Sequence, residues 1–194
     1  MQPIAKERFL ALDVFRGMTI CLMIIVNTSG NEDTTFAPLK HARLDYMVQK
    51  AVEMGASRLV PVITQHTVAE RVNLDRMRSN VVEAAEQCGI LSIPEVVEPV
   101  KLAVLLASWP AERSLVFCDE AADQKNPLTV LRALSTTPAA VLIGPEGGFS
   151  ESERAQIIAK PFAHAISLGP RIMRADTAAV AALALVSACF EFRD

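Results

Sequence analysis

The sequence predicts an α/β fold, a mostly parallel sheet with helices on both faces. Apolar stretches of strand length alternate along the chain with stretches of helical spacing, and strands separated by helices usually run parallel in a covered sheet. The chain has 194 residues, enough for one domain and a short extra segment. Hydrophobic residues make up 51% and charged residues 21%, a globular composition that excludes a disordered or collagen-like chain.

The elements up to residue 89 follow from apolar spacing and from residues that suit helix ends. The first predicted helix ends at Gly55, and its apolar side chains recur on one face: Leu44, Met47, Val48, Ala51 and Val52. Residues 58–63 predict a strand, in which Pro61 favours an edge position or a bulge because proline cannot donate to a ladder. Asn73 suits the cap of a second helix, which Gly89 ends.

The second half of the chain continues the alternation. Three apolar stretches have strand length: residues 114–118, 139–143 and 164–168. A short helix with Asn126 as its cap is predicted over residues 127–134. Ser150 and Glu153 have the spacing of a capping box and open a further helix. The last predicted helix, residues 175–190, is rich in alanine and strongly apolar, which suits a core or dimer-facing position.

Charge and metal-binding residue types exclude several classes of function. The formal net charge is −3 and the pI is about 5.7, so any RNA partner would have to bind a local basic patch rather than bulk positive charge. The four cysteines and three histidines are scattered, without a Cys-x-x-Cys pair. We therefore expect reduced thiols in a cytoplasmic protein and no metal site.

Residues 1–35 differ in character from the rest of the chain. The stretch from Arg8 to Thr28 resembles the first membrane helix of the heparan-α-glucosaminide N-acetyltransferase-like membrane proteins. We interpret residues 1–35 as a foreign segment that forms an apolar helix, from a fusion, a recombined gene or a sequence-assembly artefact, with the main domain over 36–194. The alternative is a plain amphipathic N-terminal helix.

Two observations disfavour a membrane contact through residues 8–34. The apolar run from Met18 to Val26 is shorter than the ~20 residues that a spanning helix needs. Extending the run towards residue 9 adds the charged Asp13 and Arg16, which are costly inside a bilayer. A fragment of a membrane acyltransferase would also need further spanning segments, which the sequence does not predict.

Three predicted strands are followed by loops of unusual composition: residues 118–120, 144–148 and 169–174. In an open parallel sheet, ligands bind beyond the carboxyl ends of the strands. The middle loop holds three glycines, which permit positive φ and close approach to the main chain, but it has neither the P-loop nor the G-x-G-x-x-G pattern. A plain tight turn, with Glu146 bracing backbone amides, is the alternative.

Arg171 and Arg174 lie at the start of the last predicted helix. Cations are disfavoured at a helix N-terminus, where the dipole is positive. Two arginines there indicate an anionic partner such as a phosphate or carboxylate. The alternative is that they pair with Asp176 or another nearby acid.

Four motifs then carry a resemblance to a known family. They are Asp45-Tyr-Met-Val-Gln-Lys50-Ala-Val-Glu53-Met-Gly, Glu83-Ala-Ala-Glu-Gln87, Leu142-Ile-Gly-Pro-Glu-Gly-Gly-Phe-Ser150 with Glu153, and Leu168-Gly-Pro-Arg-Ile-Met-Arg-Ala-Asp-Thr-Ala178. Together they cover roughly residues 36–192, which resemble the RsmE family of ribosomal RNA methyltransferases. The resemblance implies a SPOUT-type parallel sheet with a C-terminal trefoil knot, a homodimer, and S-adenosylmethionine-dependent methylation of N3 of a uridine in small-subunit (16S) ribosomal RNA.

The resemblance also implies site residues. The cofactor would be bound by two knot loops and by the end of an earlier strand: Glu120, Leu142, Ile143, Gly144, Pro145, Glu146, Gly147, Gly148, Leu168, Gly169, Arg171, Ile172, Met173, Asp176 and Thr177. Arg174 is the expected catalytic residue, either stabilising charge on the uridine or holding a target phosphate. No general base can be named, because no histidine is well placed.

RNA contacts are expected from a small set of polar side chains: Lys50, Arg71, Arg76, Arg78 and Gln87. For Arg76 and Arg78 the alternative is a solvated helix face. Two departures from the family stand against efficient RNA binding. Cys88-Gly89-Ile90 lacks an arginine that many relatives carry, and we expect the chain to lack the family's PUA-like front domain. We therefore expect impaired methylation, with a non-catalytic knotted dimer that binds cofactor or RNA as the alternative.

Overall fold

The structure, a computed structural model, describes residues 20–25, 37–66, 72–122, 126–134, 138–145 and 147–190. Side chains are described for all of these residues except 20–25 and 37–41. Its strands are β1 (Ile20–Ile25), β2 (Ala56–Ile63), β3 (Glu95–Val96), β4 (Val100–Lys101), β5 (Ser114–Cys118), β6 (Ala139–Ile143) and β7 (Ala163–Ile166). Its helices are α2 (Ala37–Glu53), α3 (Leu74–Cys88), α4 (Leu102–Ala107), α5 (Pro127–Leu134), α6 (Glu151–Ile158) and α7 (Ala175–Phe190).

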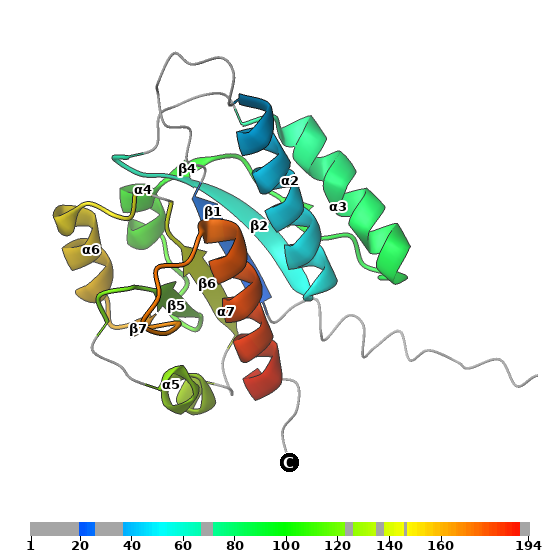
Figure 1. The fold of residues 1–194 in the computed structure, drawn as a ribbon. Coiled ribbons are helices and arrows are strands. Elements are labelled where there is room, and N and C mark those ends of the chain that lie inside the picture. The colour runs from blue at the N-terminus through cyan, green and yellow to red at the C-terminus, as the bar shows by residue number, and fades with distance from the viewer. Residues whose placement is uncertain are drawn as a thin grey trace, which may run out of the picture.

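The strands form a single parallel sheet with the order β3-β2-β1-β6-β5-β7, and β4 pairs with β2. Helices cover both faces (Figure 1). On one face, α2, α3, α5 and α7 pack over a core that includes Val48, Val116 and Leu183. On the other face, α4 and α6 pack over a second core that includes Leu106, Phe117 and Ile157. The predicted α/β fold with helices on both faces is confirmed.

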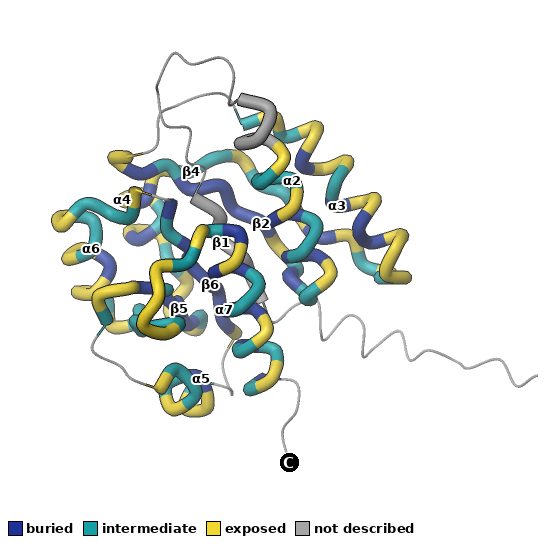
Figure 2. Tube along the Cα trace, in the orientation of Figure 1, coloured by how far each residue is buried: buried dark blue, intermediate teal, exposed yellow. Residues whose placement is uncertain are grey.

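Burial alternates along the amphipathic helices, so that each turns one face to a core (Figure 2). The predicted inward residues of α2, from Met47 to Val52, are buried. The helix ends follow the expected chemistry. The Asn73 side chain accepts a hydrogen bond from the Arg76 backbone N–H, Gly89 ends α3 in the left-handed region, and Ser150 with Glu153 forms a complete capping box.

The helix expected within residues 1–35 is wrong for residues 20–25, which form the central strand β1. β1 lies between β2 and β6 and pairs with both along most of its length. In a short run of apolar residues, periodicity does not distinguish a strand from a helix. A central parallel strand is apolar on both faces and gives such a run. The residues on either side, 1–19 and 26–36, lie outside the described part of the chain.

Two further expectations change in detail. Pro61 does not lie in an edge strand, because β2 is paired on both sides. It lies between the residues that pair with β3 and those that pair with β4, where a missing N–H is tolerated. The last predicted strand is shorter than residues 164–168 and ends at Ile166. The short elements β3, β4 and α4 were not predicted.

Candidate functional site

A cavity of about 240 Å³ lies where the chain leaves three neighbouring strands. β6, β5 and β7 are adjacent in the sheet, so the loops that follow them meet at one edge. Gly147 from the loop after β6 and Met173 from the turn before α7 both line this cavity. The prediction that the glycine loop and the arginine-bearing turn share one pocket is confirmed.

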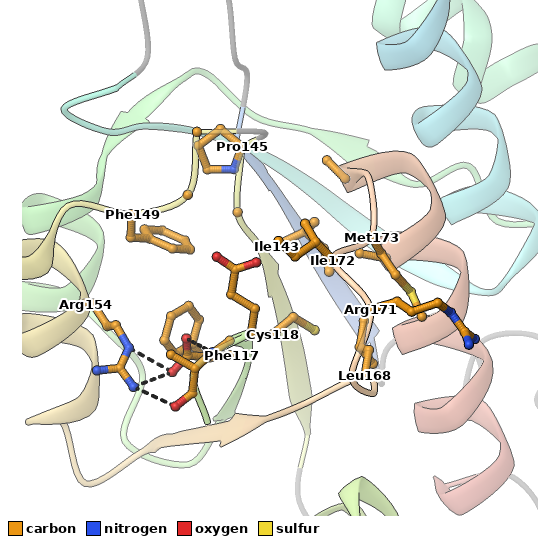
Figure 3. A pocket seen from close by; sticks show the side chains of 18 of the residues that line it. Phe117, Cys118, Ile143, Pro145, Phe149, Arg154, Leu168, Arg171, Ile172 and Met173 are labelled. Carbon is orange, nitrogen blue, oxygen red and sulfur yellow. Dashed lines mark hydrogen bonds and ion pairs between the residues drawn. The ribbon is translucent and has the colours of Figure 1, made fainter. Parts of the chain in front are cut away.

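The cavity has two unlike walls (Figure 3). On one side, the rings of Phe117 and Phe149 meet edge to face with centroids 5.1 Å apart. On the other side lie the apolar side chains Leu168, Ile172 and Met173. Ile172 is 85% exposed although it is apolar, so it offers apolar surface to a ligand beside the cavity.

Backbone conformation explains the glycines. A Cβ atom on Gly144 would lie 3.0 Å from the Phe149 ring, so this glycine lets the ring pack against the loop. Gly148 has φ +64° and Gly169 has φ +119°, conformations that L residues rarely adopt. Both residues line the cavity. The two loops therefore expose main-chain groups where side chains would otherwise stand.

The turn after β5 is held from the side by Arg154 of α6. The Arg154 guanidinium lies 2.8 Å from Asp119 and donates to the Ala121 carbonyl at 3.3 Å. Asp119 is buried, and its carboxylate also accepts from the Ala121 backbone N–H at 3.1 Å. Glu120, between these two anchored residues, lines the cavity and is exposed. The arrangement fixes the backbone that carries a carboxylate into the pocket.

Cys118 lies in the cavity wall at the end of β5. Burial raises the pKa of its thiol to about 12, because a thiolate loses its hydration there. The thiol is therefore neutral at physiological pH and is unsuited to nucleophilic catalysis.

Most of the predicted cofactor residues line the cavity: Glu120, Ile143, Gly144, Pro145, Gly147, Gly148, Leu168, Gly169, Arg171, Ile172 and Met173. Leu142 does not, because its side chain points from β6 into the core beneath α4 and α6. Asp176 and Thr177 line a different hollow, between α2 and α7. Glu146 lies outside the described residues.

Arg174 also faces the hollow between α2 and α7 rather than the cavity. Its guanidinium pairs with Asp176, whose carboxylate also accepts from the Thr177 N–H at 2.8 Å. The hydrogen bond from Arg174 holds the pKa of Asp176 below its usual range. The alternative considered for Arg174, that it pairs with Asp176, is therefore present. Arg171, in contrast, lines the cavity.

The predicted RNA contacts lie on α2 and α3, where acids accompany the cations. Lys50 donates to Glu53 at 2.7 Å, which raises the pKa of the lysine. Arg76 donates to Asp45 at 2.9 Å, and Arg78 lies 3.1 Å from Asp75. Gln87 is exposed at the end of α3. Arg71 lies outside the described residues.

Sequence reasoning missed several residues that line the cavity: Phe117, Ala121, Phe149, Arg154, Ala175 and Ala178. Arg154 sits four positions after the capping residue Ser150, and no local pattern indicates that it reaches the turn after β5. Phe149 directly follows the glycine loop, and that adjacency was the available signal.

His66 at the end of β2 was also missed. Its Nδ1 lies 3.3 Å from the Gly148 carbonyl oxygen. Next to it, the Gln65 backbone N–H donates to Glu153 at 2.7 Å, and the same carboxylate accepts from the Ser150 N–H at 3.0 Å. These bonds join the end of β2 to the glycine loop and the start of α6.

Among the residues that the structure describes, no three His, Cys, Asp or Glu side chains are grouped to hold a metal ion. Within the same ranges, every helix is too short or too polar to cross a bilayer.

Comparison with known proteins connects this geometry to a family. A family model described as "RNA methyltransferase domain" matches residues 31–187. The chain belongs to this family. The RNA methyltransferase match contains all three loops of the cavity, and the resemblance to RsmE proteins noted from the four motifs is confirmed.

Named members of this family share about three residues in ten with the chain. The Ribosomal RNA small subunit methyltransferase E of Rickettsia conorii is 29% identical over 151 residues, covering 77% of this chain and 61% of the relative. The Synechocystis protein of the same name is 30% identical over 156 residues, covering 78% and 51%. The chain thus spans less than two thirds of these relatives.

A solved structure supports the fold. The crystal structure of a Ribosomal RNA small subunit methyltransferase E from Neisseria gonorrhoeae, bound to S-adenosyl methionine, superposes with a TM-score of 0.70 at 26% identity. The match covers 91% of this chain and 68% of that one. The SPOUT-type sheet with helices on both faces is the shared architecture. The trefoil knot stays a prediction.

Proposed function

We propose that this chain binds S-adenosylmethionine in the cavity beyond β5, β6 and β7 and transfers its methyl group to small-subunit ribosomal RNA. The acceptor that we propose is N3 of a uridine in 16S ribosomal RNA, in line with the resemblance to the RsmE family. The observation that carries the proposal is the convergence of Glu120, the glycine loop and the turn before α7 on one cavity.

The lining of the cavity suits this cofactor. The exposed main chain at Gly147 and the carbonyl of the exposed Gly169 offer polar groups to a nucleobase, and the apolar wall of Leu168 and Met173 offers it a surface. Glu120 supplies a carboxylate that suits ribose hydroxyls or an ammonium group. S-adenosylmethionine, when bound, supplies a methyl group on a positively charged sulfur.

The chain's own contribution is positioning and electrostatics. Methyl transfer needs the acceptor held close and in line, and the loops fixed by Arg154 and Glu153 give the cavity a defined shape. Methylation at N3 also requires the N3 proton to leave or the developing negative charge to be stabilised. Arg174 faces the hollow between α2 and α7 rather than the cavity, so of its two expected roles we propose that its guanidinium, held by Asp176 and 59% exposed, binds a phosphate of the target RNA.

We further propose that the protein works in the cytoplasm as a homodimer, without a metal. The strongly apolar α7 supports the dimer, because its composition suits a helix covered on more than one face. We also propose that residues 36–194 are the methyltransferase domain and that residues 1–35 are of foreign origin, with β1 from that segment completing the sheet of the domain.

A second function is favoured by one specific observation. The cations expected to hold RNA on α2 and α3 are accompanied by acids of the same chain, which weakens attraction for phosphate. A knotted dimer that binds cofactor but does not turn over would show this pattern.

Two measurements on the full chain separate these functions. Titration calorimetry with S-adenosylmethionine tests the cavity, and transfer of a tritiated methyl group to isolated small ribosomal subunits tests turnover. The main proposal expects binding and transfer at a reduced rate. Binding without transfer supports the second function, and absence of binding rejects both.

A further inference from the structure

The glycine loop after β6 is held from outside the cavity by a side chain that follows β2. The Nδ1 atom of His66 lies 3.3 Å from the Gly148 carbonyl oxygen, and a Cβ atom added to Gly147 would lie 3.9 Å from the His66 Cβ. β1 separates β2 from β6 in the sheet, so this contact spans the width of a strand. His66 thus packs against the two glycines that line the cavity.

The chemistry of this contact fixes where the imidazole carries its hydrogen. A carbonyl oxygen can only accept, so Nδ1 of His66 donates to Gly148. In a neutral ring the other nitrogen, Nε2, then has no hydrogen. The other neutral tautomer would turn a bare nitrogen towards the carbonyl oxygen and lose the bond.

Gly148 is the residue of the loop at which a bond from outside has the greatest effect. Its φ is +64°, and glycine has more backbone freedom to lose than any other residue. The Gly148 N–H donates to the Pro145 carbonyl at 2.9 Å, which closes a tight turn. The bond from His66 holds the carbonyl on the other side of the same residue. The two peptide groups that flank Gly148 are therefore both oriented.

A second link joins the same two segments one residue earlier. The Gln65 backbone N–H donates to the Glu153 carboxylate at 2.7 Å, and this carboxylate also accepts from the Ser150 N–H at 3.0 Å. The link uses the main chain of Gln65 and ends at the start of α6. It stays in place when the His66 side chain is replaced, so a substitution at His66 tests the glycine loop separately.

We infer that His66 is a positioning residue for the cofactor: its Nδ1–H holds the Gly148 carbonyl and so keeps the glycine loop in the conformation that lines the cavity. The inference rests on the proposed function and adds a residue from outside the cavity to its site. A loop that is ordered before binding loses less of the binding free energy to its own ordering. His66 therefore raises the affinity for S-adenosylmethionine without touching it.

The test compares His66→Leu with His66→Asn in the full chain. Both side chains branch at Cγ, but only asparagine keeps an N–H donor close to the place of Nδ1. One net hydrogen bond corresponds to about a three- to tenfold change in an equilibrium constant. Titration calorimetry should therefore show S-adenosylmethionine bound about three- to tenfold more weakly by His66→Leu and within about twofold of the wild type by His66→Asn. Urea denaturation establishes that both variants are folded.

Two measurements without cofactor report on the loop itself. The Gly148 amide is expected to exchange its hydrogen about three- to tenfold faster in His66→Leu than in the wild type, and at the wild-type rate in His66→Asn. Nitrogen NMR of the wild-type histidine rings, with His66 assigned by its loss in His66→Asn, is expected to show the neutral ring protonated at Nδ1.

The inference is supported when His66→Leu loses cofactor affinity and protection of Gly148 while His66→Asn keeps both. It is overturned when His66→Leu binds the cofactor as tightly as the wild type, when His66→Asn is as impaired as His66→Leu, or when the neutral wild-type ring carries its hydrogen on Nε2. A wild type that does not bind S-adenosylmethionine would instead reject the proposed function, and the exchange rates would still decide whether His66 holds the loop.

Discussion

Arg154 is the residue through which α6 shapes the cofactor cavity. Its guanidinium reaches the buried Asp119 and the Ala121 carbonyl, and so fixes the backbone on both sides of Glu120 (Figure 3). Replacing it leaves a buried carboxylate without its cation, and such a group costs about 1–3 kcal/mol. The side chain thus connects global stability with the position of Glu120, which lines the proposed cofactor cavity.

We predict that Arg154→Gln lowers the free energy of unfolding by about 1–3 kcal/mol and weakens S-adenosylmethionine binding in conditions where the protein stays folded. Urea denaturation and calorimetry measure the two effects. Arg58→Gln is the control, because both side chains of the Arg58–Glu95 pair are exposed. We expect this substitution to change the free energy of unfolding by no more than about 1 kcal/mol. Unchanged cofactor affinity in Arg154→Gln would show that the turn keeps its shape without the arginine.

Cys118 and Cys88 offer a comparison within one chain. Burial raises the pKa of the Cys118 thiol to about 12, whereas Cys88 is exposed on α3. At pH 8 a thiol of that pKa is ionised to about one part in 10⁴. We predict that iodoacetamide modifies Cys88 of the native protein and spares Cys118 until the chain is unfolded, as peptide mass spectrometry would detect. Equal labelling of both would mean that the cavity wall opens.

The same thiol contributes to stability against alkali. Its pKa in the folded protein lies above its ordinary value of 9.0, so the unfolded chain releases this proton first as pH rises. The contribution is complete below about pH 9 and is lost between there and about pH 12. We expect the thermal midpoint of Cys118→Ala to fall less steeply with rising pH over that range than the midpoint of the wild type. Identical slopes for the two proteins would contradict the assignment.

At the scale of elements, the turn between β7 and α7 depends on one backbone conformation. Gly169 has φ +119°, where any L side chain is strained by about 1–3 kcal/mol. We predict that Gly169→Ala destabilises the protein by that amount and weakens cofactor binding, because the turn carries Leu168 and Met173. Gly147→Ala is the stability control, since its Cβ would lie 3.9 Å from the nearest atom, in His66, and its φ is not positive. Chemical denaturation of both variants tests the difference.

β7 also carries a titratable side chain. Burial lowers the pKa of His164, so protonation is disfavoured in the folded protein. The neutral form contributes stability above the ordinary pKa of 6.5, and this contribution is lost as pH falls through the lower folded pKa. We predict that, as the pH falls from neutral to below 6.5, the thermal midpoint of His164→Gln falls less than that of the wild type. Parallel pH profiles of the two thermal midpoints would contradict this.

The elements that the sequence predicts well are those with local causes. α3 begins at a side-chain cap and ends at a left-handed glycine, and both signals lie within a few residues of the helix ends. β1 was mistaken for part of a helix because nothing within Ile20–Ile25 reveals its partners, which are β2 and β6 from distant parts of the chain. The sequence could indicate the loops of the proposed cofactor cavity, because parallel strands place their carboxyl ends at one edge of the sheet. It could not indicate Arg154, because this side chain reaches the Asp119 carboxylate from 35 positions away along the chain.

At the scale of the whole molecule, the order of the strands in the sheet bears on whether part of residues 1–35 belongs to the core of the domain. β1 lies outside the RNA methyltransferase match, which begins at residue 31, yet it pairs on both sides with strands from inside that match. β2 and β6 make no direct pairing, so β1 alone joins the two halves of the described sheet. A segment of foreign origin would therefore have become part of the core of the domain.

We predict that deleting residues 1–36 unfolds the protein, whereas deleting residues 1–18 leaves it folded. The longer deletion removes β1 and exposes the backbone donors and acceptors of β2 and β6, and unpaired strand edges in a sheet core promote aggregation. The shorter deletion keeps β1 and serves as the control. Circular dichroism and cooperative thermal unfolding report the outcome. If the protein without residues 1–36 unfolds cooperatively at the wild-type temperature, β2 and β6 pair directly in solution, and residues 37–194 form the methyltransferase domain by themselves.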